Sequence, residues 1–496
     1  MTTANRSTTD TGLFADRETA FIDGEWLETT GARMLEVVDP STEEVVHRVR
    51  EASVADVQLA VRAARDAFDR GPWSTFTPDQ RADVIEAILA GVSARSEDLA
   101  QVATAEIGAP ISMTRNSVKF GSTYLRYYAD LARTFEFAES RKRLDGSTTR
   151  VLHEPLGTVA AIIPFNGPFS MVCMKLGPAL AAGCTVVLKA PPETPLAANI
   201  VGEVIDDLTR SGTIPHGVVN IVVADREASE ALVADPLVDK VTFTGSTAVA
   251  KQILATAGQR IARVTAELGG KSAAIVLDDA DLDQVIGPLV MGGLVNTGQA
   301  CFGLTRVLVS EARRDELVEA MTARISQLVV GDAHDESTTT GPLAGARHLE
   351  RVEAYVKQAV EDGATVAVGG NRPEHLDRGY FFEPTVLIDV DNASRVAQEE
   401  IFGPVISVIT FRDIEDAIAI ANDSVYGLGG AVFSADADRA FEIARRIRSG
   451  TVTINGFVGS HVTTPFGGYK QSGLGREGGV EGLQAFLEPK SVHLTS

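Results

Sequence analysis

The hydrophobic and polar positions of this chain follow a helical period near its beginning and a mixture of strand and helix periods beyond it. From Val54 to about Thr134 the apolar residues recur at helical spacing. Further along, short apolar runs alternate with amphipathic helices. The runs are Val159–Ile163, Thr185–Leu188, Val218–Val223 and Lys240–Phe243. Apolar strands that alternate with helices predict βαβ units and a parallel sheet covered on both faces.

A second set of alternating strands and helices begins near Ser272–Leu277 and continues to about residue 460. Two α/β units side by side would leave a cleft between them, where ligands often bind. The 496 residues are too many for one core and predict two or three domains. At the start of the chain, residues 1–18 predict a flexible arm, and Asp23-Gly24 predicts a hairpin turn.

Three segments need separate interpretation. Pro155–Met174 carries no charge and is long enough to span a membrane, but its prolines, Asn166 and Gly167 argue against a spanning helix. We therefore expect a buried strand and loop there. Arg143–Leu152 and Leu483–Leu494 are polar enough to be edge strands, and we expect them to pair with each other or with another subunit.

Composition narrows the range of partners and compartments. The formal net charge is -22 at pH 7, and such a surface repels nucleic acid and anionic membranes, so we expect neither as a partner. Cys173 and Cys184 lie among apolar residues and predict core positions, whereas Cys301 does not. Without Cys-x-x-Cys or His-x-x-x-His spacing we expect no metal site. The cysteine usage, together with residues 1–20 that lack an apolar signal segment, fits a reducing cytoplasm.

One compact stretch of chain carries the residues best suited to catalysis. It opens with Glu267 before two glycines and closes with Cys301 among small residues. A thiolate attacks carbonyl carbons, provided that a helix N-terminus or a nearby positive charge lowers the thiol pKa, and a carboxylate activates water. Taken singly, Cys301 is more typical of a core thiol and Glu267 of a solvated surface carboxylate.

Three other features have side chains that could bind an oxyanion or a cofactor. The side-chain amide of Asn166, in an apolar turn, could donate to a developing oxyanion. Phe243–Thr247 predicts a strand, a glycine turn and a helix start, where free N–H groups and the Ser246 hydroxyl would bind a phosphate. Lys189 follows a strand and could reach a ribose hydroxyl. Each has an ordinary alternative, as a turn residue, a helix cap or a solvated lysine.

Taken in order along the chain, these pieces resemble the NAD(P)-dependent aldehyde dehydrogenase superfamily from about Phe21 to Glu488. The motifs that carry the resemblance are Pro164-Phe165-Asn166, Phe243-Thr244-Gly245-Ser246, Glu267-Leu268-Gly269-Gly270-Lys271, Gly298-Gln299-Ala300-Cys301, Glu400-Ile401-Phe402-Gly403-Pro404 and Gly467-Gly468-Tyr469-Lys470-Gln471-Ser472-Gly473. Any one of them is weak, but six in the family's order at compatible spacing are specific.

The resemblance implies an α/β fold with a Rossmann-like cofactor domain, an α/β catalytic domain and a small β element that assembles a homodimer or homotetramer. The corresponding ranges are 1–130 and 152–266 for the NAD(P)-binding domain, 267–465 for the catalytic domain, and 131–151 and 478–496 for the oligomerisation strands.

The resemblance also assigns catalytic roles. Cys301 would attack the aldehyde to give a thiohemiacetal, whose oxyanion the Asn166 amide and the Cys301 backbone N–H would hold. Hydride transfer to the nicotinamide would leave a thioester. Glu267 would then activate water to release the acid, and Lys175 would help to relay protons from that glutamate.

By the same resemblance, Lys189 would bind the adenosine ribose, Ser246 the pyrophosphate and Glu400 the nicotinamide ribose, with Phe402 beside the nicotinamide. The remaining cofactor-binding residues would be Ile163, Pro164, Phe165, Glu193, Thr244, Gly245, Leu268 and Gly269. Pro192 stands where NAD-preferring relatives often have a carboxylate. Proline cannot accept a hydrogen bond from the ribose 2′-hydroxyl, so this position does not select NAD. We expect NAD as the preferred cofactor, but NADP stays open, depending on whether Glu193 reaches the ribose.

Alignment with the family suggests a substrate tunnel. Its residues would be Gly167, Met171, Met174, Val295, Phe302, Val458, Ser460, His461 and Phe466. Several of them are smaller or more flexible than the aromatic rings of relatives specialised for small aldehydes. We therefore expect a wide apolar tunnel for medium-chain or bulky hydrophobic aldehydes.

Three alternatives remain at this point. A relative that transfers the acyl group to coenzyme A usually lacks the glutamate, so Glu267 argues for hydrolysis. A cysteine-dependent hydrolase needs a histidine base near the thiol, and His461 is the one candidate near the tunnel. An inactive scaffold of the same fold would not need Cys301, Glu267 and Asn166 together.

Overall fold

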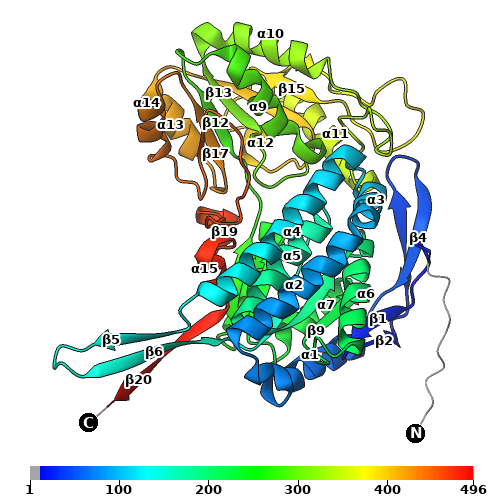
Figure 1. Ribbon diagram of the computed structural model, residues 1–496. Helices are drawn as coiled ribbons and strands as arrows, with labels where there is room; N and C mark the ends of the chain where they lie inside the picture. The colour runs from blue at the N-terminus through cyan, green and yellow to red at the C-terminus, as the bar shows by residue number, and fades with distance from the viewer. Residues whose placement is uncertain (1–11, 495–496) are drawn as a thin grey trace.

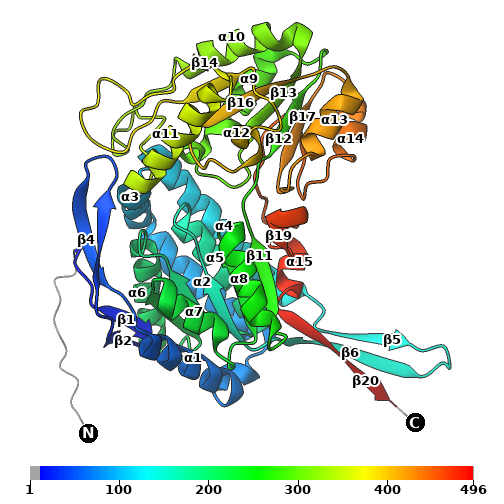
Figure 2. The ribbon, with the colours of Figure 1, turned by 180° about the vertical axis from the view of Figure 1, so that it is seen from behind.

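The computed structural model describes residues 12–494, which form two sheet-based units and a three-stranded ribbon that projects from one of them (Figure 1 and Figure 2). Residues 1–11 of the predicted arm at residues 1–18 lie outside the described residues. The prediction is wrong for the rest of the arm, because Leu13 and Phe14 pack against the first hydrophobic core and the Arg17 backbone bridges to Val49. Within residues 12–494, no helix has the length and apolar character needed to cross a membrane.

The first sheet has eight strands in the order β19-β11-β10-β7-β8-β9-β1-β2. Their bounds, in that order, are Gly473–Leu474, Arg263–Glu267, Lys240–Thr244, Thr158–Ile162, Thr185–Ala190, Val219–Val223, Thr19–Ile22 and Glu25–Glu28. The strands from β11 to β9 run parallel. The chain winds from β7 to β9 on one side of β7, then returns to the other side for β10 and β11, which is a doubly wound order. The predicted turn at Asp23-Gly24 joins β1 to β2.

Alternate residues of these strands face two different helical layers. Val186 and Leu188 of β8 pack in one hydrophobic core, whereas Val187 between them packs in another. The helices of the first layer are α2 (Pro78–Ala94), α3 (Ser96–Ile107), α4 (Ile111–Thr134), α5 (Pro168–Ala182) and α6 (Leu196–Arg210). Those of the second are α1 (Val54–Asp69), α7 (Arg226–Ala234) and α8 (Thr247–Gly258). Burial on both faces explains why the strands read as unbroken apolar runs.

The second sheet has seven strands in the order β14-β15-β16-β13-β12-β17-β18. Their bounds, in that order, are Thr365–Val368, Thr385–Ile388, Val405–Phe411, Arg306–Ser310, Ala273–Val276, Gly430–Phe433 and Thr453–Ile454. Its helices are α9 (Leu282–Leu294) and α10 (Arg314–Ile325) on one face, and α11 (Ala346–Glu361), α12 (Arg395–Gln398), α13 (Ile414–Asn422) and α14 (Ala437–Ala444) on the other. The expectation of a second α/β set is confirmed.

The ribbon contains strands from both segments that were predicted to mediate assembly, residues 131–151 and 478–496. β20 (Leu487–Leu494) pairs antiparallel with β6 (Thr148–Pro155) along its whole length, and β5 (Ala138–Lys142) flanks the other side of β6. The predicted pairing of two polar segments with each other is therefore confirmed. The predicted strand at Leu483–Leu494 begins too early, because Leu483 lies in helix α15 (Gly479–Gln484) and is fully buried there. The predicted strand at Arg143–Leu152 also begins too early, because residues 143–147 form the turn between β5 and β6.

The expectation of strand and loop across Pro155–Met174 is wrong in its second half. Helix α5 begins at Pro168, and nearly all of its residues are buried. Pro168 occupies the first turn of the helix, where a residue without an N–H group costs nothing. The proline that looked like a break in the sequence is therefore the start of a helix.

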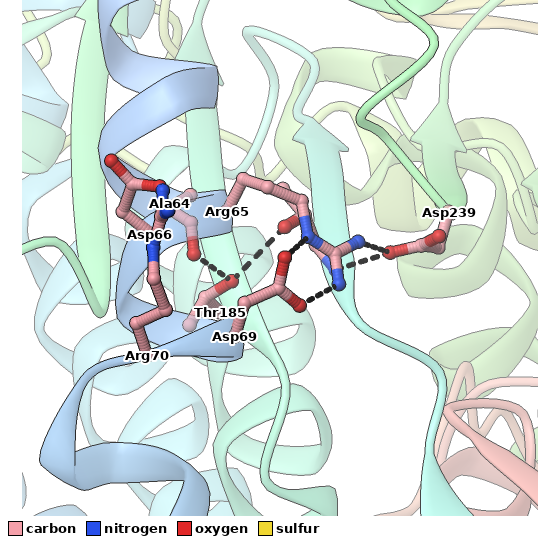
Figure 3. Close-up of polar contacts among 8 residues, drawn as sticks. Ala64, Arg65, Asp66, Asp69, Arg70, Thr185 and Asp239 are labelled. Carbon is pink, nitrogen blue, oxygen red and sulfur yellow. Dashed lines mark hydrogen bonds and ion pairs between the residues drawn. The ribbon is translucent and has the colours of Figure 1, made fainter.

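Polar contacts fasten helix α1 to the amino ends of the central strands (Figure 3). Arg65 Nη1 donates to Asp239 Oδ2 at 2.8 Å, and the Thr158 backbone N–H donates to the same oxygen at 2.8 Å. The Thr185 hydroxyl donates to the Ala64 carbonyl at 2.9 Å. At this edge of the sheet, charged and polar groups satisfy one another.

Candidate active site

The carboxyl edge of the first sheet gathers most of the predicted cofactor residues. β7 and β10 are neighbours at the point where the winding direction reverses, and in doubly wound sheets ligands bind at the carboxyl ends of such strands. The residues at or just beyond the carboxyl ends of β7, β8, β10 and β11 are Ile163, Pro164, Phe165, Asn166, Lys189, Glu193, Thr244, Gly245, Ser246, Glu267, Leu268 and Gly269. Residues from four separate segments thus meet at one edge.

Cys301 lies in a tight loop that several hydrogen bonds fix in place. The Asn166 side-chain amide donates to the Gln299 carbonyl at 2.8 Å, and the Asn296 amide donates to the Asn166 carbonyl at 3.0 Å. Gly270 packs against the Cys301 backbone so closely that an added Cβ would collide with the Cys301 carbonyl oxygen. The two halves of the catalytic stretch are therefore in contact, with the Asn166 amide held next to the cysteine loop.

The Cys301 thiol is half-buried, and its electrostatic surroundings differ from the expectation of a cation or helix terminus. Burial raises the pKa of the Cys301 thiol well above its ordinary value, and the carboxylates of Glu400 and Glu267 raise it further. Backbone N–H groups of Cys301 and Phe302 act in the opposite direction. The thiol is therefore protonated at neutral pH in this state, and a positive charge brought beside it would favour the thiolate.

Glu267 ends strand β11 and is only 3% exposed, and neither carboxylate oxygen has a hydrogen-bond partner among the described residues. Burial raises the pKa of Glu267 well above its usual range, Glu477 raises it further, and Lys175 and Arg476 lower it. Gly467 lines the space, since a Cβ there would lie 2.6 Å from Glu267 Oε1. A buried carboxylate with unused oxygens and raised proton affinity is suited to act as a base.

Lys175 lies on α5, is fully buried and forms an ion pair with Glu477. Glu477 Oε1 also accepts a hydrogen bond from the Thr242 hydroxyl at 3.2 Å. Because Glu477 acts on the pKa of Glu267, the ion pair is electrostatically linked to the candidate base. Glu477 was not among the predicted site residues, although it lies four residues beyond the end of the glycine-rich motif at Gly473.

Glu400 meets the glycines that follow Glu267. The Gly270 N–H donates to Glu400 Oε1 at 3.1 Å, and a Cβ on Gly269 would lie 2.6 Å from Glu400 Oε2. Glycine at position 269 lets this carboxylate approach the backbone, and a larger residue there would displace it. Burial raises the pKa of Glu400 above its usual value.

Three aromatic rings meet between the two units near the cofactor residues. The Phe165 ring lies 5.8 Å from that of Phe402, edge to face, and 4.7 Å from the imidazole of His348 on α11. Burial, followed by Arg347 and Arg351, lowers the pKa of His348 to about 4. A lone histidine in a helical stretch gives no sequence signal, and His348 was not predicted.

The residues predicted to contact the phosphate and the ribose interact with other groups of the protein. The Ser246 hydroxyl caps α8 by accepting from the Val249 N–H at 3.3 Å. Lys189 is half-buried; burial lowers its pKa, and Glu193 and Asp225 oppose that shift. Glu193 itself lies 3.8 Å from the Arg347 guanidinium.

The predicted tunnel residues fall into two groups. Met174 on α5 and Phe466 are buried, and Gly167, Met171, Val295, Phe302 and Ser460 are partly buried. Val458 is 53% exposed, and His461 is exposed, with Nδ1 2.8 Å from the Thr463 hydroxyl. The Phe302 ring lies 5.7 Å from that of Phe457 and 6.3 Å from that of Phe466. Among residues 12–494, no three His, Cys, Asp or Glu side chains gather as a metal site would require.

Comparison with known proteins places this site in a family. The family described as "Aldehyde dehydrogenase family" matches residues 26–492. The chain is 44% identical to a geranial dehydrogenase of Castellaniella defragrans over 481 residues, covering 97% of this chain and 99% of the relative. It is 40% identical to a 3-succinoylsemialdehyde-pyridine dehydrogenase of a Pseudomonas species over 476 residues, covering 95% and 97%.

Solved structures agree with the sequence relatives. The fold matches the Mycobacterium tuberculosis aldehyde dehydrogenase complexed with NAD+ with a TM-score of 0.94 at 42% identity, covering 97% of this chain and 99% of that one. A mutant of Pseudomonas syringae aldehyde dehydrogenase C in complex with NAD+ and octanal matches with a TM-score of 0.92 at 39% identity, covering 96% of each chain. The predicted resemblance and α/β fold class are confirmed: the chain belongs to the aldehyde dehydrogenase family and is an oxidoreductase that acts on aldehydes.

Proposed function

We propose that this enzyme oxidises a medium-chain or bulky hydrophobic aldehyde to its carboxylic acid, with NAD(P)+ as hydride acceptor and Cys301 as nucleophile. The observation that carries the proposal is the buried Glu267 carboxylate, which has no hydrogen-bond partner among residues 12–494. The glycine segment that follows it packs against the Cys301 backbone at Gly270. A protein that used this site only for packing would gain by pairing that carboxylate or replacing it.

The residues at the carboxyl edge fit a nicotinamide dinucleotide. Gly269 leaves room for Glu400 to approach a ribose, and the start of α8 offers backbone N–H groups to a pyrophosphate. The structural neighbours described above were solved with NAD+, which supports the same cofactor here. When bound, the cofactor accepts the hydride. We propose NAD over NADP, and a comparison of kcat/KM for the two cofactors tests this.

We assign a residue of this chain to each step before and after hydride transfer. The Cys301 thiol gives up its proton to solvent, which the positive charge of a bound nicotinamide ring would favour, and the sulfur attacks the aldehyde carbon. The Asn166 amide and the Cys301 N–H receive the resulting oxyanion. Once the substrate carbon is oxidised to a thioester, Glu267 takes a proton from water, whose oxygen attacks the thioester and frees the sulfur and the acid. The buried Lys175–Glu477 pair is positioned to carry that proton onward.

The substrate class rests on the side chains around Cys301. Phe302, which follows Cys301 in the sequence, packs its ring against those of Phe457 and Phe466, and these three rings form an apolar wall. The octanal complex of one structural neighbour and the geranial specificity in the name of one relative support a similar substrate size. An aldehyde panel followed by absorbance of the reduced cofactor tests the assignment. A far higher kcat/KM for acetaldehyde than for octanal would contradict it.

The three alternatives make different predictions. Transfer to coenzyme A would yield an acyl-CoA instead of acid, and the buried base at Glu267 favours acid. A cysteine hydrolase would cleave esters without a cofactor, but His461 is exposed and engaged with Thr463, and the charged groups that act on Cys301 are carboxylates. An inactive scaffold would be unaffected by Cys301→Ala.

We further propose that residues 1–130 and 152–266 bind the cofactor, 267–465 complete the catalytic unit, and 131–151 with 478–496 mediate assembly. The ribbon of β5, β6 and β20 stands clear of the body of the chain, as an assembly element would (Figure 1). Light scattering of the purified enzyme tests for a homodimer or homotetramer. The free Cys173 and Cys184 support a reducing cytoplasm as its compartment.

A further inference from the structure

A tyrosine and a serine from distant parts of the chain meet beside the residues nearest the nucleophile. The Tyr124 hydroxyl on α4 donates to Ser460 Oγ at 3.2 Å. Gly459, just before Ser460, packs so closely on the Phe302 ring that an added Cβ would collide with it. Phe302 directly follows Cys301. Ser460 is thus one residue from a direct contact with the ring beside the nucleophile.

Tyr124 is rigidly held behind this serine. Its side chain is fully buried, and its ring meets that of Phe120 edge to face at 5.5 Å. Burial raises the pKa of Tyr124 to about 12, and the carboxylates of Glu477 and Glu267 contribute to the rise. The phenol is therefore neutral, and its single proton is committed to Ser460.

Ser460 keeps one hydrogen-bonding group unused. A serine hydroxyl has one donor and two acceptor positions, and Tyr124 occupies an acceptor position. Among residues 12–494 the Ser460 hydroxyl hydrogen has no acceptor, and the residue is only partly buried. The donor is therefore available to a molecule in the predicted tunnel.

We propose that Ser460 donates a hydrogen bond to a second oxygen of the substrate, with Tyr124 as its positioning residue. The preferred substrate is then an aldehyde with an apolar body and one further oxygen acceptor, such as a ketone. This inference rests on the proposed function and refines its substrate class. The rings of Phe302, Phe457 and Phe466 offer no hydrogen-bond donor. The Ser460 hydroxyl therefore selects among substrates by the position of their second oxygen along the chain.

The magnitude follows from the cost of leaving such a donor unused. A site built to hydrogen-bond a substrate oxygen rejects the analogue that lacks it, and one neutral hydrogen bond changes the rate ratio by about tenfold. The wild-type enzyme is therefore expected to prefer one keto-octanal over octanal, the best isomer being the one whose ketone reaches Ser460.

The test is a series of kcat/KM measurements with octanal and with octanals that carry one ketone at successive positions along the chain. In Ser460→Ala the ratio of kcat/KM for the best keto isomer to kcat/KM for octanal falls by about tenfold, mostly through the KM of the keto isomer. Tyr124→Phe shows a smaller loss in the same direction. Ser122→Ala is the matched control, because its hydroxyl donates only to the Val118 carbonyl within α4.

Two outcomes would overturn the inference. One is a wild-type enzyme with no preference for any keto isomer over octanal. The other is an equal loss for octanal and every keto isomer in Ser460→Ala, which is the signature of a structural role. Failure of the proposed function looks different, since no aldehyde would then reduce the cofactor.

Discussion

The two edges of the first sheet are built in opposite ways. At the amino edge, Asp239 pairs with Arg65 (Figure 3) and also accepts from the Thr158 N–H. At the carboxyl edge, Glu267 is more deeply buried than Asp239, yet neither of its oxygens has a partner among the described residues. The same strands thus end in satisfied contacts on one side and an unsatisfied carboxylate on the other.

The difference shows where the fold gives up stability for chemistry. A buried polar group without a partner costs about 1 to 3 kcal/mol, and more if it is charged. The amino edge avoids that cost, and the carboxyl edge accepts it at the residue best placed to act as a base. Substitutions at the amino edge should therefore change stability, and those at the carboxyl edge should change rate.

The largest expected effect is on the nucleophile. Cys301→Ala should lower aldehyde oxidation by at least about a thousandfold, because no other group forms the thioester. Absorbance of the reduced cofactor measures the rate. Cys173→Ala is the control, since that buried thiol packs in the core and its loss should cost stability but little activity. Equal activity of the two variants would remove Cys301 from the mechanism.

The second largest effect is expected for Glu267→Gln. Steady-state acid production should fall by about a hundredfold or more, because the amide cannot accept a proton from water. Quantifying the acid against time gives the rate. Asp239→Asn, at the opposite edge of the sheet, should keep the wild-type rate, and a comparable fall in both variants would contradict the proposed division between the edges.

Lys175→Met should affect both stability and rate, because it leaves the Glu477 carboxylate buried and unpaired. The free energy of unfolding should fall by about 3 kcal/mol, measured by urea titration. Combining Lys175→Met with Glu477→Leu should recover much of that stability but not the rate of acid release. A double variant with wild-type turnover would show that the pair has only a packing role.

Asp239→Ala should destabilise by about 2 kcal/mol, because Arg65 and the Thr158 N–H lose their common acceptor. Its kcat/KM at moderate temperature should stay within about twofold of wild type. A large fall in kcat/KM without loss of stability would show that this edge also takes part in catalysis.

The smallest effect concerns pH. The folded pKa of Glu267 is raised, so this group stabilises the fold at low pH, and that stabilisation is lost as pH rises through the folded pKa. Glu267→Gln removes the dependence. Its melting temperature should exceed that of wild type by a few degrees at neutral pH and converge with it below pH ~4. A constant difference across the pH range would mean that the carboxyl group does not titrate in this way.

Local patterns predicted the fold class and the central residues, because Glu267, Cys301 and Asn166 each lie in a short motif of small residues or turns. Contacts between residues far apart in the sequence could not be predicted. Lys175 and Glu477 lie 302 positions apart, and only the packing of α5 against the C-terminal segment brings them together. The sequence carries no signal for such a pairing.

Two further misses have the same cause. The sequence conceals the start of α5, because Pro168 resembles a helix break, although a proline in the first turn favours a helix. Tyr124 falls in the helical pattern, where its spacing predicts only a core residue, and its contact with Ser460 exists solely in three dimensions. Sequence periodicity predicts which side chains are buried, but not which distant hydroxyl they meet.

The most direct test of the account is rapid mixing of Glu267→Gln with octanal and NAD+, followed by intact mass measurement of the protein. We predict a burst of reduced cofactor stoichiometric with Cys301, then slow turnover, and a protein mass increased by one acyl group. The result that would contradict the account is a variant that shows no burst and carries no acyl group, or one that releases acid at the wild-type rate.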